Sequence, residues 1–322
     1  NVRGRNETLK LTAQIAFTKS IQISYGLPFI DRKQKVGLNF LFDYSLNKNT
    51  NIVTTDHKYI FLDSDNWLRE QYQAGVSVTY RNSLYNHHTF GLNFNQSQVN
   101  DTILELNPNY YTGGTSQGYF RIYYSFVYDS RDIKAYPLSG NYFAGRIEKL
   151  GIGVINEVDV FGLTAFYNRF IDLGKHFYFT VGVGGALYAP EKQPYSLYNS
   201  MGKVPFTLRG YELYVIEGPY FVQNQYTLRK RLFQTETNLR NILSSKHFSK
   251  FQLALYFKSY FDFGYVKAYP ENEMNKRFTD TLIYGGGAGF DLVTFYDLVF
   301  RFEYSINKAG EHGFVFGIRS PF

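Results

Sequence analysis

Apolar and polar residues alternate one by one along much of this 322-residue chain. In residues 120–129 the apolar parity carries Phe120, Ile122, Tyr124, Phe126 and Tyr128. The opposite parity includes Arg121, Ser125 and Asp129. A period of two indicates a β-strand with one apolar face and one polar face, because successive side chains point to opposite sides of a sheet.

About fourteen segments show this alternation. They are residues 6–16, 19–28, 36–47, 71–81, 86–99, 117–129, 141–151, 157–171, 176–189, 231–243, 250–267, 280–293, 297–306 and 313–322. Some connections are tight, as at 173–175, whereas others are long: 48–70, 100–116, 190–230 and 268–279. Short turns at one rim and long loops at the other are typical of bacterial outer-membrane barrels.

A soluble antiparallel sandwich also alternates, but two features favour a membrane barrel. The polar faces carry long charged side chains, as a wet lumen would, and we expect these to face the lumen: Lys10, Arg121, Lys258, Arg301 and Glu303. The apolar faces are rich in aromatic residues, which a barrel needs on its lipid face and in its two interfacial girdles. We expect the lipid face to include Phe120, Phe126, Phe251, Phe257, Phe300 and Phe302.

Composition narrows the class of protein further. Tyrosine and phenylalanine number 30 and 31, and aromatic residues make up 19% of the chain, an unusual share for a soluble domain. No apolar run reaches the roughly 18 residues of a spanning helix, which excludes an α-helical membrane protein. The absence of cysteine fits an oxidising envelope only weakly. The chain opens without the apolar stretch of a signal peptide, so we expect it to be part of a longer precursor.

The net charge of +7 fits a lumen and loops rich in lysine and arginine, some of them facing anionic lipopolysaccharide. Nucleic-acid binding is not expected, because no basic helix or RNA-binding signature accompanies the charge. Histidines give no metal site: His87 and His88 are adjacent in a strand and so point to opposite faces. The His-Glu-x-x-His pattern of metalloproteases is absent. We therefore expect neither an enzyme nor a cofactor.

The loop 190–230 is about forty residues long, far beyond an ordinary hairpin connection, so it needs a role or a packing partner. It carries the tetrad Leu208-Arg209-Gly210-Tyr211. Glycine permits a tight turn beside the wall, and the planar guanidinium of Arg209 suits a carboxylate. Asp262 lies on the lumen parity of its strand, so we predict an Arg209–Asp262 ion pair inside the barrel. We expect Glu236 or Asn238 to be a second partner.

Several further motifs occur in a fixed order along the chain. Leu27-Pro28-Phe29 closes an early strand, and Asp129-Ser130-Arg131-Asp132 precedes Pro137-Leu138-Ser139-Gly140. The tetrad comes next, followed by Phe261-Asp262-Phe263-Gly264 and the run Gly285–Gly289. In this order, the motifs resemble those of the BamA/TamA superfamily of outer-membrane barrels across essentially the whole chain. The last segment, with Phe314, Phe316, Ile318 and Phe322 on one parity, matches the C-terminal strand signal.

The resemblance implies a single antiparallel transmembrane β-barrel over residues 1–322, with 190–230 as its inward-folded loop. Family members have sixteen strands, and the first match here, Arg5-Asn6-Glu7 after Gly4, aligns with the third. The first two strands and the periplasmic POTRA domains are therefore expected upstream of this chain. The edge strand 7–17 and the terminal strand 313–322 should then lie on either side of a gap and should not pair with each other.

The resemblance also implies a function in the outer membrane. The expected activity is assembly or translocation of other proteins, in which client barrels insert through a lateral seam by strand addition. The expected partners are outer-membrane lipids, lipopolysaccharide, unfolded client outer-membrane proteins, and accessory lipoproteins or periplasmic proteins. Two alternatives stay open at this point: a barrel that anchors an N-terminal enzyme domain such as a patatin-like lipase, and a passive porin-like channel.

Overall fold

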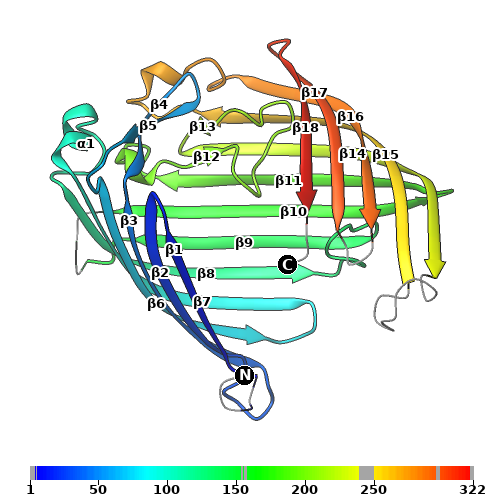
Figure 1. The fold of residues 1–322 in the computed structure, drawn as a ribbon, viewed down its shortest axis with the longest axis horizontal. Coiled ribbons are helices and arrows are strands. Elements are labelled where there is room, and N and C mark those ends of the chain that lie inside the picture. Colours follow the sequence, from blue (N-terminus) through cyan, green and yellow to red (C-terminus); the bar gives the residue numbers. More distant parts are fainter. Residues whose placement is uncertain are drawn as a thin grey trace.

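The computed structural model describes residues 4, 6–153, 155, 158–238, 250–294 and 298–319. Its main feature is an antiparallel sheet of 14 strands, each paired with the next. The strands are β1 (Thr8–Ile15), β2 (Thr18–Leu27), β3 (Val36–Asn47), β6 (Arg69–Arg81), β7 (Asn86–Val99), β8 (Ser116–Asp129), β9 (Gly140–Leu150), β10 (Val160–Gly174), β11 (Phe177–Ala189), β14 (Tyr220–Asn238), β15 (Lys250–Lys267), β16 (Leu282–Thr294), β17 (Val299–Asn307) and β18 (His312–Arg319). The sheet curls around a central space, which we call the lumen (Figure 1).

The strand order confirms the all-β antiparallel fold that the alternation predicts. The largest difference is β14, which begins at Tyr220 rather than at residue 231. A register shift lies between Arg231 and Phe233, so the side-chain parity changes within the strand and its first half does not continue the pattern of its second half. The long loop therefore spans residues 190–219.

Smaller elements gather at the rim of the long loops. They are the hairpin β4 (Asn49–Thr55) and β5 (Lys58–Asp63), helix α1 (Asp101–Leu106), the 3-10 turns η1 (Tyr195–Leu197) and η3 (Glu273–Asn275), and the short pair β12 (Ser200–Met201) and β13 (Ile216–Glu217). We call this group the cap. Its own apolar core includes Ile103, Tyr110 and Tyr195, all of them buried. No helix that the structure describes is long and apolar enough to cross a membrane.

The two faces of the wall differ as the alternation predicts. In β17, Glu303 and Ser305 are buried on the inner face, whereas Phe302 and Tyr304 are 38% and 54% exposed on the outer face. Similar exposed apolar side chains recur on the outer faces of other strands. An outer surface with so many exposed apolar side chains marks contact with lipid or with a partner.

The other orientation predictions can be checked along the same strands. Lys258 is buried on the inner face of β15, beside the outward Phe257, which is 39% exposed. Arg121 lies within 4.0 Å of Glu148 on the inner face. Phe120, Phe126, Phe300 and Arg301 are half-buried in their strands, and Lys10 is exposed. The side chain of Phe251 lies outside the described residues.

Strands β1 and β18 end the sheet order, and within the described residues they do not pair with each other. This agrees with the prediction of two separate edges. All eight residues of β1 are exposed. An edge of this kind presents unpaired backbone N–H and C=O groups to any strand that approaches it.

Candidate functional site

The loop between β11 and β14 folds into the lumen and packs on the inner wall. Leu208 and Tyr211 are each 2% exposed. They belong to an apolar cluster whose other members come from the loop, from strands of the wall and from the β15–β16 loop: Ala186, Met201, Ile216, Phe221, Val266, Phe278 and Ile283. The apolar members of the tetrad therefore fix the loop in place, so that Arg209 is held against the wall.

Arg209 makes the ion pair with Asp262 that the sequence predicts. Its Nε–H donates to Oδ2 of Asp262 over 2.8 Å, and an Nη2–H donates to Oδ1 of the same carboxylate. The backbone N–H of Arg209 also donates to Oδ2, over 3.1 Å. The remaining guanidinium donors reach Thr227 Oγ1 at 2.9 Å and the carbonyl of Tyr226 at 3.2 Å.

Burial makes this ion pair costly to disturb. Asp262 has no exposed side-chain surface, and 18% of the Arg209 side chain is exposed. The guanidinium also stacks on the ring of Tyr260, 4.1 Å from its centroid. Loss of one partner from a buried pair leaves an uncompensated charge and costs about 3–5 kcal/mol. The pair therefore fixes the position of the loop on the wall.

Glycines allow the loop tip to approach the wall closely. Gly210 has a φ of 91°, which L-residues with side chains rarely adopt. A Cβ at Gly285 of β16 would lie 2.2 Å from the carbonyl oxygen of Arg209. At Gly264 of β15 it would lie 3.0 Å from Cε of Met201. The glycine-rich strand thus admits loop backbone at a place where any side chain would collide with it.

Hydrogen bonds between side chains and backbone groups join the loop to the wall. Nε2 of Gln225 donates to the carbonyl of Thr207 over 2.7 Å, and Nδ2 of Asn307 donates to the carbonyl of Gly210 over 3.0 Å. The Tyr211 hydroxyl donates to the carbonyl of Tyr284 over 3.2 Å. Strands β14, β16 and β17 therefore each contribute contacts beside those of β15.

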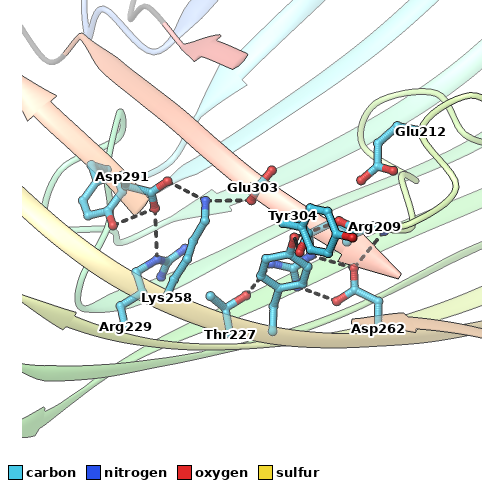
Figure 2. A network of polar contacts seen from close by, with 12 residues as sticks. Arg209, Glu212, Thr227, Arg229, Lys258, Asp262, Asp291, Glu303 and Tyr304 are labelled. Carbon is cyan, nitrogen blue, oxygen red and sulfur yellow. Dashed lines mark hydrogen bonds and ion pairs between the residues drawn. The ribbon is translucent and has the colours of Figure 1, made fainter. Parts of the chain in front are cut away.

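A second ionic cluster lies along the same inner face. Nζ of Lys258 donates to Oδ1 of Asp291 and lies 2.6 Å from Glu303, while Arg229 lies 4.0 Å from Asp291. Figure 2 shows Glu303 between the Lys258–Asp291 pair and Arg209. We use the name charged wall for the inner face of β14–β17, defined by Thr227, Arg229, Lys258, Tyr260, Asp262, Asp291, Glu303 and Ser305.

The inner face of β2–β8 has a different chemistry. We call it the amide wall, and it carries Gln22, Asp43, Arg69, Gln71, Gln73, Asn93, Asn95 and Gln117. Nε2 of Gln22 donates to Asp43 over 3.0 Å. Much of this face borders a cavity of about 170 Å³ below the cap. Unlike the charged wall, most of it carries neutral side chains and borders open space.

The second partner predicted for Arg209 is wrong. Thr227, not Glu236, occupies that position, and Glu236 accepts a hydrogen bond from Gln252 over 3.4 Å. Nine residues of one strand separate Thr227 from Glu236, which corresponds to roughly 30 Å. The error follows from the predicted start of this strand at residue 231, which placed Thr227 in the loop. Asn238 pairs through its backbone with Lys250, and its side chain lies outside the described residues.

The remaining motif residues do not join the loop site. Asp129, Arg131, Asp132, Pro137 and Gly140 form the turn between β8 and β9 at the opposite rim. Phe314, Phe316 and Ile318 lie on the outer face of β18 and are 65%, 52% and 59% exposed, while Phe322 lies outside the described residues. In the described part of the chain, no group of three or more His, Asp or Glu side chains could hold a metal ion.

Comparison with known proteins matches the model of the Omp85 superfamily domain to residues 1–319. No curated protein sequence matches the chain. The crystal structure of BamA from Haemophilus ducreyi lacking POTRA domains 1–3 aligns with a TM-score of 0.66 and 12% identity, over 98% of this chain and 65% of that chain. CdiB from Acinetobacter baumannii aligns with a TM-score of 0.53 and 11% identity, over 94% and 49% of the two chains.

CdiB from Escherichia coli gives a TM-score of 0.54 and 7% identity, over 94% of this chain and 52% of that chain. This chain thus spans about half to two thirds of the length of these structures. At such identities the likeness is one of fold, and it agrees with the resemblance seen in the motifs. The family match covers nearly every residue, and the chain belongs to the Omp85 superfamily.

Proposed function

We propose that this protein works in the outer membrane as an assembly or translocation factor, and that it inserts client β-barrel proteins through a lateral seam. The single observation that carries the proposal is the inward loop held by Arg209 and Asp262. A porin-like channel would be expected to carry opposed charge clusters on such a loop, whereas this loop pairs its Arg209 with Asp262 of the wall. The loop instead braces the strands that lead to the β18 edge, because Asn307 of β17 binds its backbone.

Strand addition supplies the mechanism of the proposal. A seam that opens presents unpaired backbone groups, and the terminal strand of a client can pair with them. In lipid each unpaired backbone group costs several kcal/mol, so a client gains free energy with every pair that it completes. Insertion then needs no nucleotide. The partners in this scheme are the client, lipids and lipopolysaccharide, with accessory lipoproteins or periplasmic proteins as further candidates.

The test uses the full-length protein, purified and reconstituted in liposomes. An unfolded outer-membrane barrel is added, and its folding is followed by heat-modifiable migration on gels. We expect the wild type to accelerate client folding and Arg209→Ala to be slower. Arg32→Ala, which removes an exposed arginine from the β2–β3 turn, is the matched control and should behave as wild type.

Two outcomes would contradict the proposal. If the wild type folds the client no faster than empty liposomes, an assembly function is wrong. If the liposomes also swell in small sugars at porin-like rates, the passive channel becomes the better explanation. An N-terminal enzyme domain, with the barrel as its anchor, would be recognised from the sequence upstream of this chain and from hydrolytic activity of the full-length protein.

A further inference from the structure

The turn between β8 and β9, residues 130–139, is an ordered structure of its own. Arg131 binds both carboxylate oxygens of Asp129, at 2.7 and 2.8 Å, and its guanidinium lies 4.4 Å from the ring centroid of Tyr142. Asp132 Oδ1 accepts from the N–H of Leu138 over 3.0 Å. At Gly140, where φ is 100°, a Cβ would lie 2.2 Å from a backbone oxygen. The Asp-x-Arg-Asp and Pro-x-x-Gly motifs thus build one rigid turn.

This turn presents Tyr136 to the far side of the lumen. The Tyr136 hydroxyl donates to Oδ2 of Asp291 over 2.9 Å, and its ring packs 4.9 Å from that of Tyr256. The guanidinium of Arg229 lies over the ring of Tyr136, 5.3 Å from its centroid. Strands β10, β11 and β14 separate β9 from β15 in the sheet order, so these contacts cross the interior of the barrel.

The side chain of Tyr136 therefore packs against the charged wall, close to the loop site. It is 8% exposed, and the groups around its hydroxyl are buried too: Asp291 is 1% exposed and Lys258 is 3% exposed. Lys258, Tyr260 and Asp262 alternate on the inner face of β15. The turn from the short-turn rim contacts β15 at Tyr256, and the loop from the long-loop rim contacts the same strand at Asp262.

We propose that Tyr136 is a second anchor of the charged wall. As a positioning residue, it holds the β8–β9 turn inside the lumen, and the turn covers the entrance to the lumen from the short-turn rim. The loop 190–219 covers the wall from one end, and the turn covers it from the other. A polypeptide or solute that reaches the wall from the short-turn rim must first displace Tyr136. This inference goes beyond protein assembly, because it concerns access to the lumen whatever the barrel transports.

The chain offers a direct reporter, because it contains no cysteine. Ala254 lies in the apolar cluster of Tyr136 and is 9% exposed, so Ala254→Cys should react slowly with a water-soluble thiol reagent. In the double variant with Tyr136→Ala the rate should rise roughly tenfold, since a hydrogen bond to a buried charge and its packing are lost. With Tyr136→Phe, which keeps the ring, the rise should be smaller.

The matched control is Tyr85→Ala, a tyrosine in the neighbouring turn of the same rim that is 51% exposed. It should leave the labelling rate of Ala254→Cys unchanged. Ion conductance of the full-length protein in planar bilayers gives a second readout, which should rise in Tyr136→Ala and not in Tyr85→Ala. Circular dichroism and heat-modifiable migration establish that each variant folds.

Equal labelling of Ala254→Cys with and without Tyr136, in folded protein, would overturn the inference. Rapid labelling in the otherwise wild-type chain would do the same, because the turn would then not cover the wall. If Tyr136→Ala does not fold, the comparison between Tyr136→Phe and the otherwise wild-type chain decides. Neither readout depends on a client, so the anchor can fail while the assembly function stands, or the reverse.

Discussion

The amide wall and the charged wall line the same lumen but differ in what covers them. The charged wall lies under two inward segments, and its ions are buried and paired, with Asp262 fully covered by Arg209 and its neighbours. The amide wall borders a cavity of about 170 Å³, and most of its side chains are neutral amides. Asn95 Nδ2 has no partner among the described residues.

The difference follows from the cost of desolvation. An ion removed from water needs a partner of opposite charge and further hydrogen bonds, so a covered surface that carries ions must be built as a matched set. Neutral amides can both donate and accept, and they tolerate water at any of their atoms. A covered wall is therefore specific for one loop position, whereas an open wall can change in sequence at little cost.

The largest effect should come from the buried ion pair. Arg209→Ala should lower the free energy of unfolding by about 3–5 kcal/mol, because Asp262 is left charged and buried. The double variant Arg209→Ala/Asp262→Ala should recover part of this loss. Urea titration of the protein in lipid vesicles measures both values. An Arg209→Ala variant as stable as wild type would mean that water replaces the guanidinium and that the pair does not fix the loop.

Steric closeness should give the next largest effect. Gly285→Ala places a Cβ against the Arg209 carbonyl oxygen, so it should cost about 1–3 kcal/mol, as overpacking does. Gly317→Ala in β18 is the control, because a Cβ there meets nothing within 4 Å. The same urea titration compares the two. Equal stabilities would show that the loop tip shifts freely and that the charged wall is less closely covered than its contacts indicate.

A substitution in the amide wall should have a small effect. Asn95→Ala should change the free energy of unfolding by no more than about 1 kcal/mol, because it removes a half-buried amide that borders the cavity. Single-channel conductance should rise slightly, since the cavity becomes wider. A loss comparable with that of Arg209→Ala would remove the distinction between the two walls.

The cap joins the loops above the two walls. Among the predicted effects, the response of the cap to pH should be the smallest at neutral pH. His57 Nε2 accepts from the N–H of Phe278 over 3.0 Å. Burial lowers the pKa of His57 to about 4, with Asp56 opposing and Arg277 reinforcing the shift. The neutral ring is therefore favoured in the folded cap. Its stabilisation is complete above the unfolded pKa of about 6.5 and is lost as pH falls toward 4.

His57→Gln keeps a hydrogen-bond acceptor without a titrating ring. The conductance of the His57→Gln variant should match that of the wild type at pH 7.5. At pH 4.5 it should rise less than that of the wild type, because no ring is protonated in the cap at this position. Glu217 acts in the opposite sense, because burial raises its pKa to about 7 and its stabilisation is lost as pH rises through that value. The measurement is therefore repeated in a Glu217→Gln background. The same acid response with and without His57 would exclude this histidine as its source.

Much of the barrel could be predicted from sequence, because a lipid face and a lumen face impose a period of two on each strand. The Arg209–Asp262 contact was accessible for a related reason: a glycine turn, a planar cation and a carboxylate of known parity limit the choices. Thr227 could not be predicted as a partner, since the register shift after Arg231 interrupts the alternation and the first half of β14 was not recognised as a strand. Tyr136 gave no local signal, because its hydrogen-bond partner Asp291 lies 155 residues away in the sequence and on the far side of the lumen.

The position of the loop in the chain bears on when it can dock. Every strand of the charged wall follows the loop in sequence. Asp262, the partner of Arg209, lies 53 residues later, and Asn307, the partner of Gly210, lies 97 residues later. Contacts between residues so far apart carry a large loop-closure entropy cost, which the pairing of the intervening strands reduces. The full set of loop contacts therefore requires β14 to β17 to lie side by side, so a docked loop indicates that this part of the wall has formed.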